Sequence, residues 1–169
     1  MKTFAFFACM MLVAAQNTPL NVTQTAMVFK GLYDLDLPTY GVSTDIALCV
    51  SDFLQCGADI AEAVSDFQAD KIAQGCAQIA DCVNIVPDLI DNCGFDPSEE
   101  EAFKINSIDE LLTDMEENPN FVTIGAINNY SEVRRFAQGA QIAFEEGDLV
   151  KLGRFMASII VSIARGQIE

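Results

Sequence analysis

The chain has 169 residues, of which 51% are hydrophobic and 20% are charged, a length that fits one domain or two small ones. Its 25 acidic and 9 basic residues give a formal net charge of −16, which excludes a typical nucleic-acid binder because a polyanion requires a basic surface. The chain has no histidine, which excludes a Ser/His/Asp triad, a Cys/His dyad and most zinc and non-haem iron sites. We therefore expect no enzyme, no catalytic residue, no cofactor and no metal site.

The first 15 residues have the pattern of a secretory signal peptide. Lys2 supplies a positive charge, and the run from Thr3 to Ala15 is apolar and ends in small residues. This run is shorter than the roughly 20 residues that span a bilayer. We expect cleavage after Ala15, with an uncleaved anchor or a buried N-terminal helix as the alternatives. The prediction is a secreted protein, extracellular or at the cell surface, without a stable membrane span.

Two glycosylation sequons agree with secretion. They are Asn21-Val22-Thr23 and Asn129-Tyr130-Ser131. We predict that Asn21 and Asn129 carry glycans if the chain enters a secretory compartment.

After the leader, residues 16–169 are predicted to form a single helical domain that begins with a short helix over 22–33. Apolar or small residues then recur in steps of three and four over 46–67 and again over 72–90, which is typical of two amphipathic helices. The short connection between them predicts an antiparallel hairpin over about 44–93.

Local signals predict where these two helices begin and bend. Thr44 or Asp45 suits the N-cap of the first helix, and Asp70 suits the N-cap of the second. Pro87 lies within the second helical pattern, where we expect it to kink the helix without ending it.

Five cysteines remain after removal of the leader, all within this hairpin, and an oxidising compartment favours disulfides between them. In an antiparallel pair, residues equidistant from the turn face each other. With the turn near residue 69, Cys56 and Cys82 each lie 13 positions from it, and Cys49 and Cys93 lie 20 and 24 positions from it. We therefore predict the bridges Cys56–Cys82 and Cys49–Cys93. Cys76 is left over, either as a buried free thiol or as an intermolecular disulfide.

Acidic middle helices are predicted over about 97–118. Ser98 and Glu101 form a capping-box pattern, and Ser107 with Glu110 repeats it as the start of a further helix. Asn118-Pro119 is expected to end this region. The acidic cluster lacks the spacing of an EF-hand loop, so we interpret it as a solvated helix start and not as a calcium site.

A second helical hairpin is predicted over about 121–166. Gly147 breaks the pattern and Asp148 suits the N-cap of the last helix. In that helix we expect Phe155, Ile159 and Ile163 to face inward, and Ile160 and Val161 to be partly exposed.

The two hairpins share an order of residues. Phe67, Asp70 and Gly75 in the first correspond to Phe144, Asp148 and Gly153 in the second. We interpret the glycines as sites where the paired helices approach closely, and the hairpins as either related or similar by chance. The predicted fold class is all-α: a disulfide-stapled helical bundle of two antiparallel hairpins with short N-terminal and middle helices.

The order of several motifs resembles a family. Phe29-Lys30-Gly31 is followed by Cys49-Val50-Ser51-Asp52, by the segment Asp59 to Phe67, by Cys93, and by the segment Phe144 to Gly153. This order resembles a group of small secreted, cysteine-containing helical proteins of ciliated protozoa. The resemblance implies a secreted all-helical protein more than it implies an activity.

Two functions fit these observations. The first is a secreted structural or interaction protein, a subunit of an extracellular or cell-surface assembly, with protein partners or self-association. The alternative is a carrier of lipid or of another small hydrophobic ligand in a helical-bundle cavity. An enzyme without histidine would need a pair of catalytic carboxylates, as in glycoside hydrolases. The acidic pairs in this sequence have the spacing of solvent-exposed helix surfaces, so they do not require a catalytic role.

Overall fold

A computed structural model describes residues 18–34 and 45–166; the predicted signal peptide, with Cys9, and the preferred cleavage site lie outside them. Within the described residues all regular structure is helical, which confirms the all-α class. The helices are α2 (Val22–Tyr33), α3 (Ile46–Gln68), α4 (Ile72–Asn84), α5 (Val86–Cys93), α6 (Glu99–Glu117), α7 (Pro119–Asn128), α8 (Tyr130–Glu146) and α9 (Leu149–Arg165).

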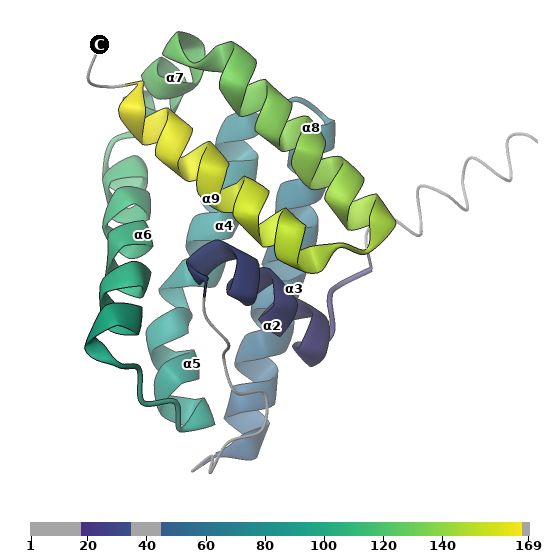
Figure 1. Ribbon diagram of the computed structural model, residues 1–169, viewed down its shortest axis with the longest axis vertical. Coiled ribbons are helices and arrows are strands. Elements are labelled where there is room, and N and C mark those ends of the chain that lie inside the picture. Colours follow the sequence, from purple (N-terminus) through teal and green to yellow (C-terminus); the bar gives the residue numbers. More distant parts are fainter. Residues whose placement is uncertain (1–17, 35–44, 167–169) are drawn as a thin grey trace, which may run out of the picture.

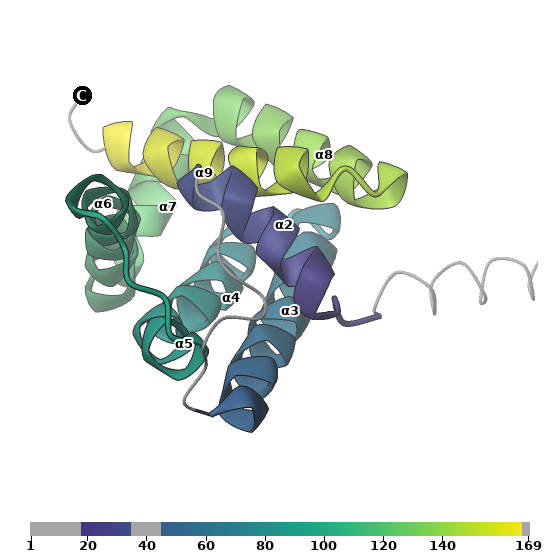
Figure 2. The same cartoon turned by 60° about the horizontal axis from the view of Figure 1, so that its bottom comes forward.

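The helices form two layers with α2 between them. Helices α3 and α4 pair in one layer with α5 beside them, and α8 and α9 pair in the other (Figure 1). Figure 2 shows α2 lying between the α8–α9 layer and the α3–α4 layer, with α6 and α7 closing one side. Helix α2 has its most extensive contact with α9, so the first and last described helices meet at the centre of the bundle.

Several helices begin where side-chain capping predicts. The Asp45 carboxylate accepts from the N–H groups of Ala47 and Leu48 at the start of α3, and Asp148 accepts from Lys151 N–H at the start of α9. Ser98 and Glu101 form the predicted capping box of α6. These polar ends satisfy amide groups that have no partner within the helix.

The prediction for Asp70 is wrong. The residue adopts a left-handed conformation with φ of 58°, and Lys71 takes the N-cap position of α4 without a side-chain cap. The N–H groups of Asp70 and Lys71 bond back to carbonyls of α3. Asp70 therefore closes α3, because aspartate tolerates the left-handed turn that this link requires.

Two predictions about helix boundaries also differ from the structure. The second helix ends at Asn84 and α5 starts at Val86, so Pro87 marks a break and not a kink. Proline has no N–H and its ring opposes the carbonyl four residues before it, which favours a new helix start. Conversely, Ser107 starts no helix: α6 is continuous, and the Ser107 hydroxyl donates to the Phe103 carbonyl.

The last helix is more deeply buried than its pattern predicts. Ile160 is fully buried with Ile159 and Ile163, whereas Phe155 and Val161 are partly buried. The expected exposure of Ile160 is wrong because α9 contacts α2 and α6 as well as α7 and α8. A helix with neighbours on several sides buries more than one stripe.

Glycines allow the backbones of α2 and α9 to touch. A methyl group on Gly153 would overlap the carbonyl oxygen of Val28, and one on Gly31 would overlap that of Val150. Gly75, by contrast, faces the ring of Phe67 across the first hairpin. The two glycines therefore have different roles, and Gly153 serves the crossing with α2 and not the pairing of α8 with α9.

Candidate functional site

A disulfide joins the start of α3 to the end of α5. Cys49 and Cys93 are bonded, with Cα atoms 4.9 Å apart, and both are buried in the core. This pairing confirms one of the two predicted bridges. The bond stabilises the first hairpin at the end opposite its turn, where the helices would otherwise separate most easily.

The second predicted bridge is absent from the structure. Cys56 and Cys82 do face each other across α3 and α4, but both are free thiols. The Cys56 Sγ donates to the backbone carbonyl of Cys82 at 3.0 Å. Equal distance from the turn correctly predicts that Cys56 and Cys82 lie side by side. A disulfide also requires that their side chains point toward each other at a suitable angle, which the spacing in sequence does not determine.

Cys76 is a third free thiol, buried on α4. Burial raises its pKa to about 12, so the thiolate that forms disulfides is scarce at neutral pH. The structure therefore favours a buried free thiol over the intermolecular disulfide, because a partner cannot reach this sulfur in the folded chain.

A buried polar cluster surrounds the Cys56–Cys82 contact. The Tyr33 hydroxyl and the Oδ2 atom of Asp59 are buried without a hydrogen-bond partner. Burial, and then the nearby thiols of Cys82 and Cys56, raise the pKa of Tyr33 well above its usual value. Burial is also the main cause that raises the pKa of Asp59, while the Gln55 amide, which donates to its Oδ1, lowers that pKa.

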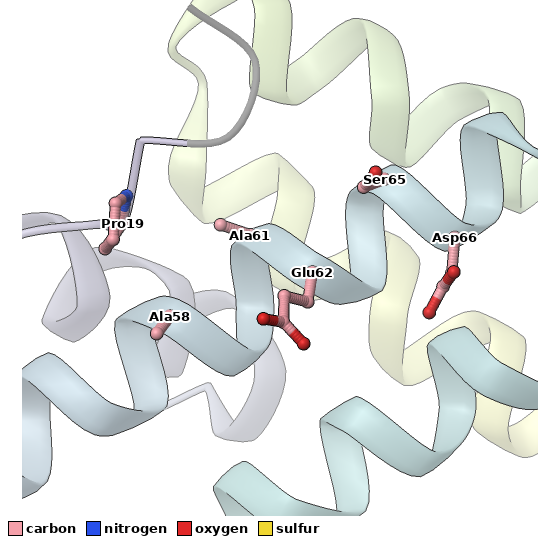
Figure 3. Close-up of a pocket in the computed structure, with 6 residues that line it drawn as sticks. All are labelled: Pro19, Ala58, Ala61, Glu62, Ser65 and Asp66. Carbon is pink, nitrogen blue, oxygen red and sulfur yellow. The ribbon is translucent and has the colours of Figure 1, made fainter. Parts of the chain in front are cut away.

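A surface hollow of about 330 Å³ lies along α3. It is lined by Pro19, Ala58, Ala61, Glu62, Ser65 and Asp66. Figure 3 shows that Pro19 comes from the segment before α2 and that the other residues come from successive turns of α3. Asp66 also pairs with Lys71 at 3.7 Å. The hollow presents two carboxylates and a hydroxyl to solvent, which suits polar contact.

The two sequons have different environments. Asn21 is exposed, and its Oδ1 accepts from Gln24 N–H as the N-cap of α2. Asn129 is partly buried, and its Nδ2 donates to the Ser162 carbonyl of α9 at 2.7 Å. A glycan is attached through this nitrogen, so Asn21 is the accessible acceptor and Asn129 has a packing role.

The described residues contain no group of three or more acidic or cysteine side chains arranged to hold a metal ion. In the α6 cap, the Glu101 carboxylate is occupied by the Ser98 hydroxyl and amide, which lower its pKa. Among the same residues, no helix is long and apolar enough to cross a membrane.

Large apolar side chains are exposed on α6 and α7, which sequence reasoning missed. Phe103 is 72% exposed and Ile127 is 68% exposed, with Ile124 and Tyr130 near the latter. The signal was present in the sequence: residues 118–131 contain no charged residue and no clear apolar stripe. A segment of that composition is expected either in a core or at a contact.

Comparisons with protein-family models, with curated proteins and with solved structures gave no match. The resemblance to secreted helical proteins of ciliated protozoa stays a prediction.

The free thiols allow a direct test. Native protein without reductant is expected to resist iodoacetamide, because all three thiols are buried and burial raises the pKa of Cys76 and Cys82. After denaturation without reductant, mass spectrometry should count three alkylated cysteines in the mature chain. A single alkylated cysteine would instead show that Cys56 and Cys82 are bonded, and a fourth would show that Cys9 is retained.

Asp59→Asn is expected to stabilise the fold at neutral pH. The folded pKa of Asp59 is raised above the unfolded value of about 3.9, so ionisation opposes folding at pH values above the raised pKa. This cost disappears as the pH falls and the carboxyl is protonated in both states. Urea unfolding should therefore show a gain at pH 7 that shrinks towards pH 3. Glu146→Gln, at an exposed carboxylate near the end of α8, is the control and should show little change at pH 7.

Proposed function

We propose that this chain is a secreted interaction protein, a subunit of an extracellular or cell-surface assembly held by non-covalent contacts. The observation that carries the proposal is the exposure of large apolar side chains, of which Phe103 at 72% and Ile127 at 68% are the most exposed among the described residues. Exposed aromatic and branched side chains of this size are typical of contact surfaces. The intramolecular Cys49–Cys93 bond supports an oxidising compartment.

The carrier hypothesis requires an enclosed apolar space. The hollow beside Glu62 and Asp66 is open to solvent, and two carboxylates line it. The aromatic residues that such a cavity would need, including Phe29 and Phe53, are instead packed against each other in the core, with ring centroids 6.1 Å apart. The geometry therefore supports contact with proteins better than storage of a ligand.

Native mass spectrometry of the secreted protein tests this proposal. We expect oligomers that grow with concentration and that dissociate on denaturation without reductant, because no described thiol is available for a bond between chains. A monomer at all concentrations that releases an apolar molecule on denaturation would overturn the proposal in favour of a carrier.

N-glycosylation tests separately whether the chain enters a secretory compartment. In a eukaryotic secretory host, the folded, secreted protein is expected to carry one N-glycan, on Asn21, because a glycan on the Nδ2 of Asn129 would displace its hydrogen bond to the Ser162 carbonyl of α9 and prevent this packing. Asn21→Gln should abolish the mass shift on treatment with an N-glycosidase, whereas Asn129→Gln should leave it unchanged. A glycopeptide containing Asn129 would contradict the assignment of that residue to packing.

A further inference from the structure

We propose that the partner is a second copy of the chain, joined head to tail through two different surfaces. One is the α6 ridge, defined as Glu99, Phe103, Glu110 and Asp114. The other is the junction patch, defined as Ile124, Ile127, Tyr130 and Arg134 at the junction of α7 and α8. This inference rests on the proposed function and names the contact through which assembly occurs.

The α6 ridge combines an exposed ring with negative charge. Its residues are four, seven and four positions apart, so they follow one side of the helix. All four are exposed, and Phe103 lies between the carboxylates of Glu99 and Glu110. Helix α6 is also strongly acidic, with Lys104 as its one basic residue. Phe103 is therefore an apolar anchor within an anionic surface.

The junction patch has the complementary composition. Ile124 and Ile127 are one turn apart on α7, and the guanidinium of Arg134 lies 5.8 Å from the centre of the Tyr130 ring. Tyrosine and arginine are enriched among residues that dominate binding at protein interfaces. The basic residues nearest in sequence are Arg134 and Arg135, of which Arg135 pairs with Glu132 at 3.8 Å. The patch is thus apolar with a cationic edge, in a chain of net charge −16.

Charge decides how two copies meet. A contact between two α6 ridges would place carboxylates against carboxylates, and a contact between two junction patches would bring their arginines together. A contact between the α6 ridge of one copy and the junction patch of another places Phe103 among the isoleucines and Arg134 near carboxylates. This pairing is therefore favoured over a contact between two ridges or between two patches.

Phe103, the apolar anchor of the α6 ridge, is too far from the junction patch for the two to contact each other within one copy. Phe103 is near the start of α6, and about 21 Å of helix separates it from the end that leads into α7, at 1.5 Å per residue. Figure 1 shows α6 running along one edge of the molecule from α5 to α7. A contact between unlike surfaces leaves one of each free, so further copies can add to form a chain or a closed ring.

Two variants and their mixture test this contact. Phe103→Lys removes the anchor of the ridge and leaves the patch intact; Ile127→Asp does the reverse. Both side chains are exposed, so both variants are expected to fold, as circular dichroism will show. In sedimentation at 0.15 M NaCl, each variant should associate more than about tenfold more weakly than the wild type. Ile142→Asp, at an isoleucine that is exposed on α8 outside the patch, is the matched control and should associate as the wild type does.

The equimolar mixture of the two variants gives the decisive result. Each retains one intact surface, so the mixture should form a 1:1 dimer and nothing larger. A mixture that remains monomeric overturns the head-to-tail contact. A wild type that assembles but is unaffected by Phe103→Lys and Ile127→Asp overturns this contact and leaves the proposed function standing. A wild type that is monomeric at millimolar concentration overturns both.

Discussion

Gly153→Ala is expected to lower the free energy of unfolding by about 3 kcal/mol or more, one of the largest losses from a single substitution in this chain. The added methyl group would overlap the Val28 carbonyl oxygen and would crowd the amide of Leu32. These are backbone atoms of α2, so they cannot rotate away as a side chain would. The helices must separate, and the contact that joins the two layers loosens along its length.

Gly147→Ala is the matched control for this substitution. Gly147 has φ of 73° and no atom within 4 Å of an added methyl group, so alanine meets only the cost of a left-handed conformation, about 1 kcal/mol. Urea denaturation followed by circular dichroism measures both variants. Equal losses at the two positions would contradict a backbone contact between α2 and α9.

Replacing Cys49 and Cys93 together by alanine is expected to destabilise the fold by about 4 kcal/mol. The bond joins residues 44 positions apart, and a closed loop of this length restricts the unfolded chain by about that amount. The substitution should therefore act mainly by increasing the conformational entropy of the unfolded chain. The folded variant should keep the helical circular dichroism spectrum of the wild type. The measurement is urea unfolding of the double variant without reductant.

The matched control is Cys56→Ala with Cys82→Ala, which alters two buried cysteines of the same hairpin but breaks no bond. This variant loses the thiol that donates to the Cys82 carbonyl and leaves small voids, with an expected cost of about 1–3 kcal/mol. Reduction of the wild type should lower its free energy of unfolding by as much as the Cys49/Cys93 double substitution does. The Cys56/Cys82 control should show a different, smaller loss. A wild type whose stability does not change on reduction would contradict the prediction.

The parts of the fold that sequence predicted correctly depend on neighbours along the chain. Asp45, Ser98 and Asp148 act within one turn, so their roles as helix caps follow from local chemistry. The break at Gly147 is local in the same way. The Cys49–Cys93 pairing was predicted by counting outward from the turn, and it holds although the structure places Cys93 on a third helix, α5.

The parts that were missed depend on distant contacts or on side-chain direction. Ile160 is buried because α9 has neighbours on several sides, which its own periodicity does not reveal. Gly153 has its role through Val28, a residue near the other end of the chain. The thiols of Cys56 and Cys82 show that facing positions do not make a bond. The exposure of Phe103 and Ile127 likewise depends on which sides of α6 and α7 the core leaves uncovered.

The meeting of α2 and α9 has a consequence for synthesis. Of the described helices, an elongating chain produces α2 first and α9 last, yet Val28, Phe29 and Leu32 are buried in a core that includes α9. A nascent chain that has emerged only as far as Gly147 lacks the helix that covers them. Folding of this domain must therefore wait until α9 has been synthesised, and before that point the chain presents an apolar helix that a chaperone can hold.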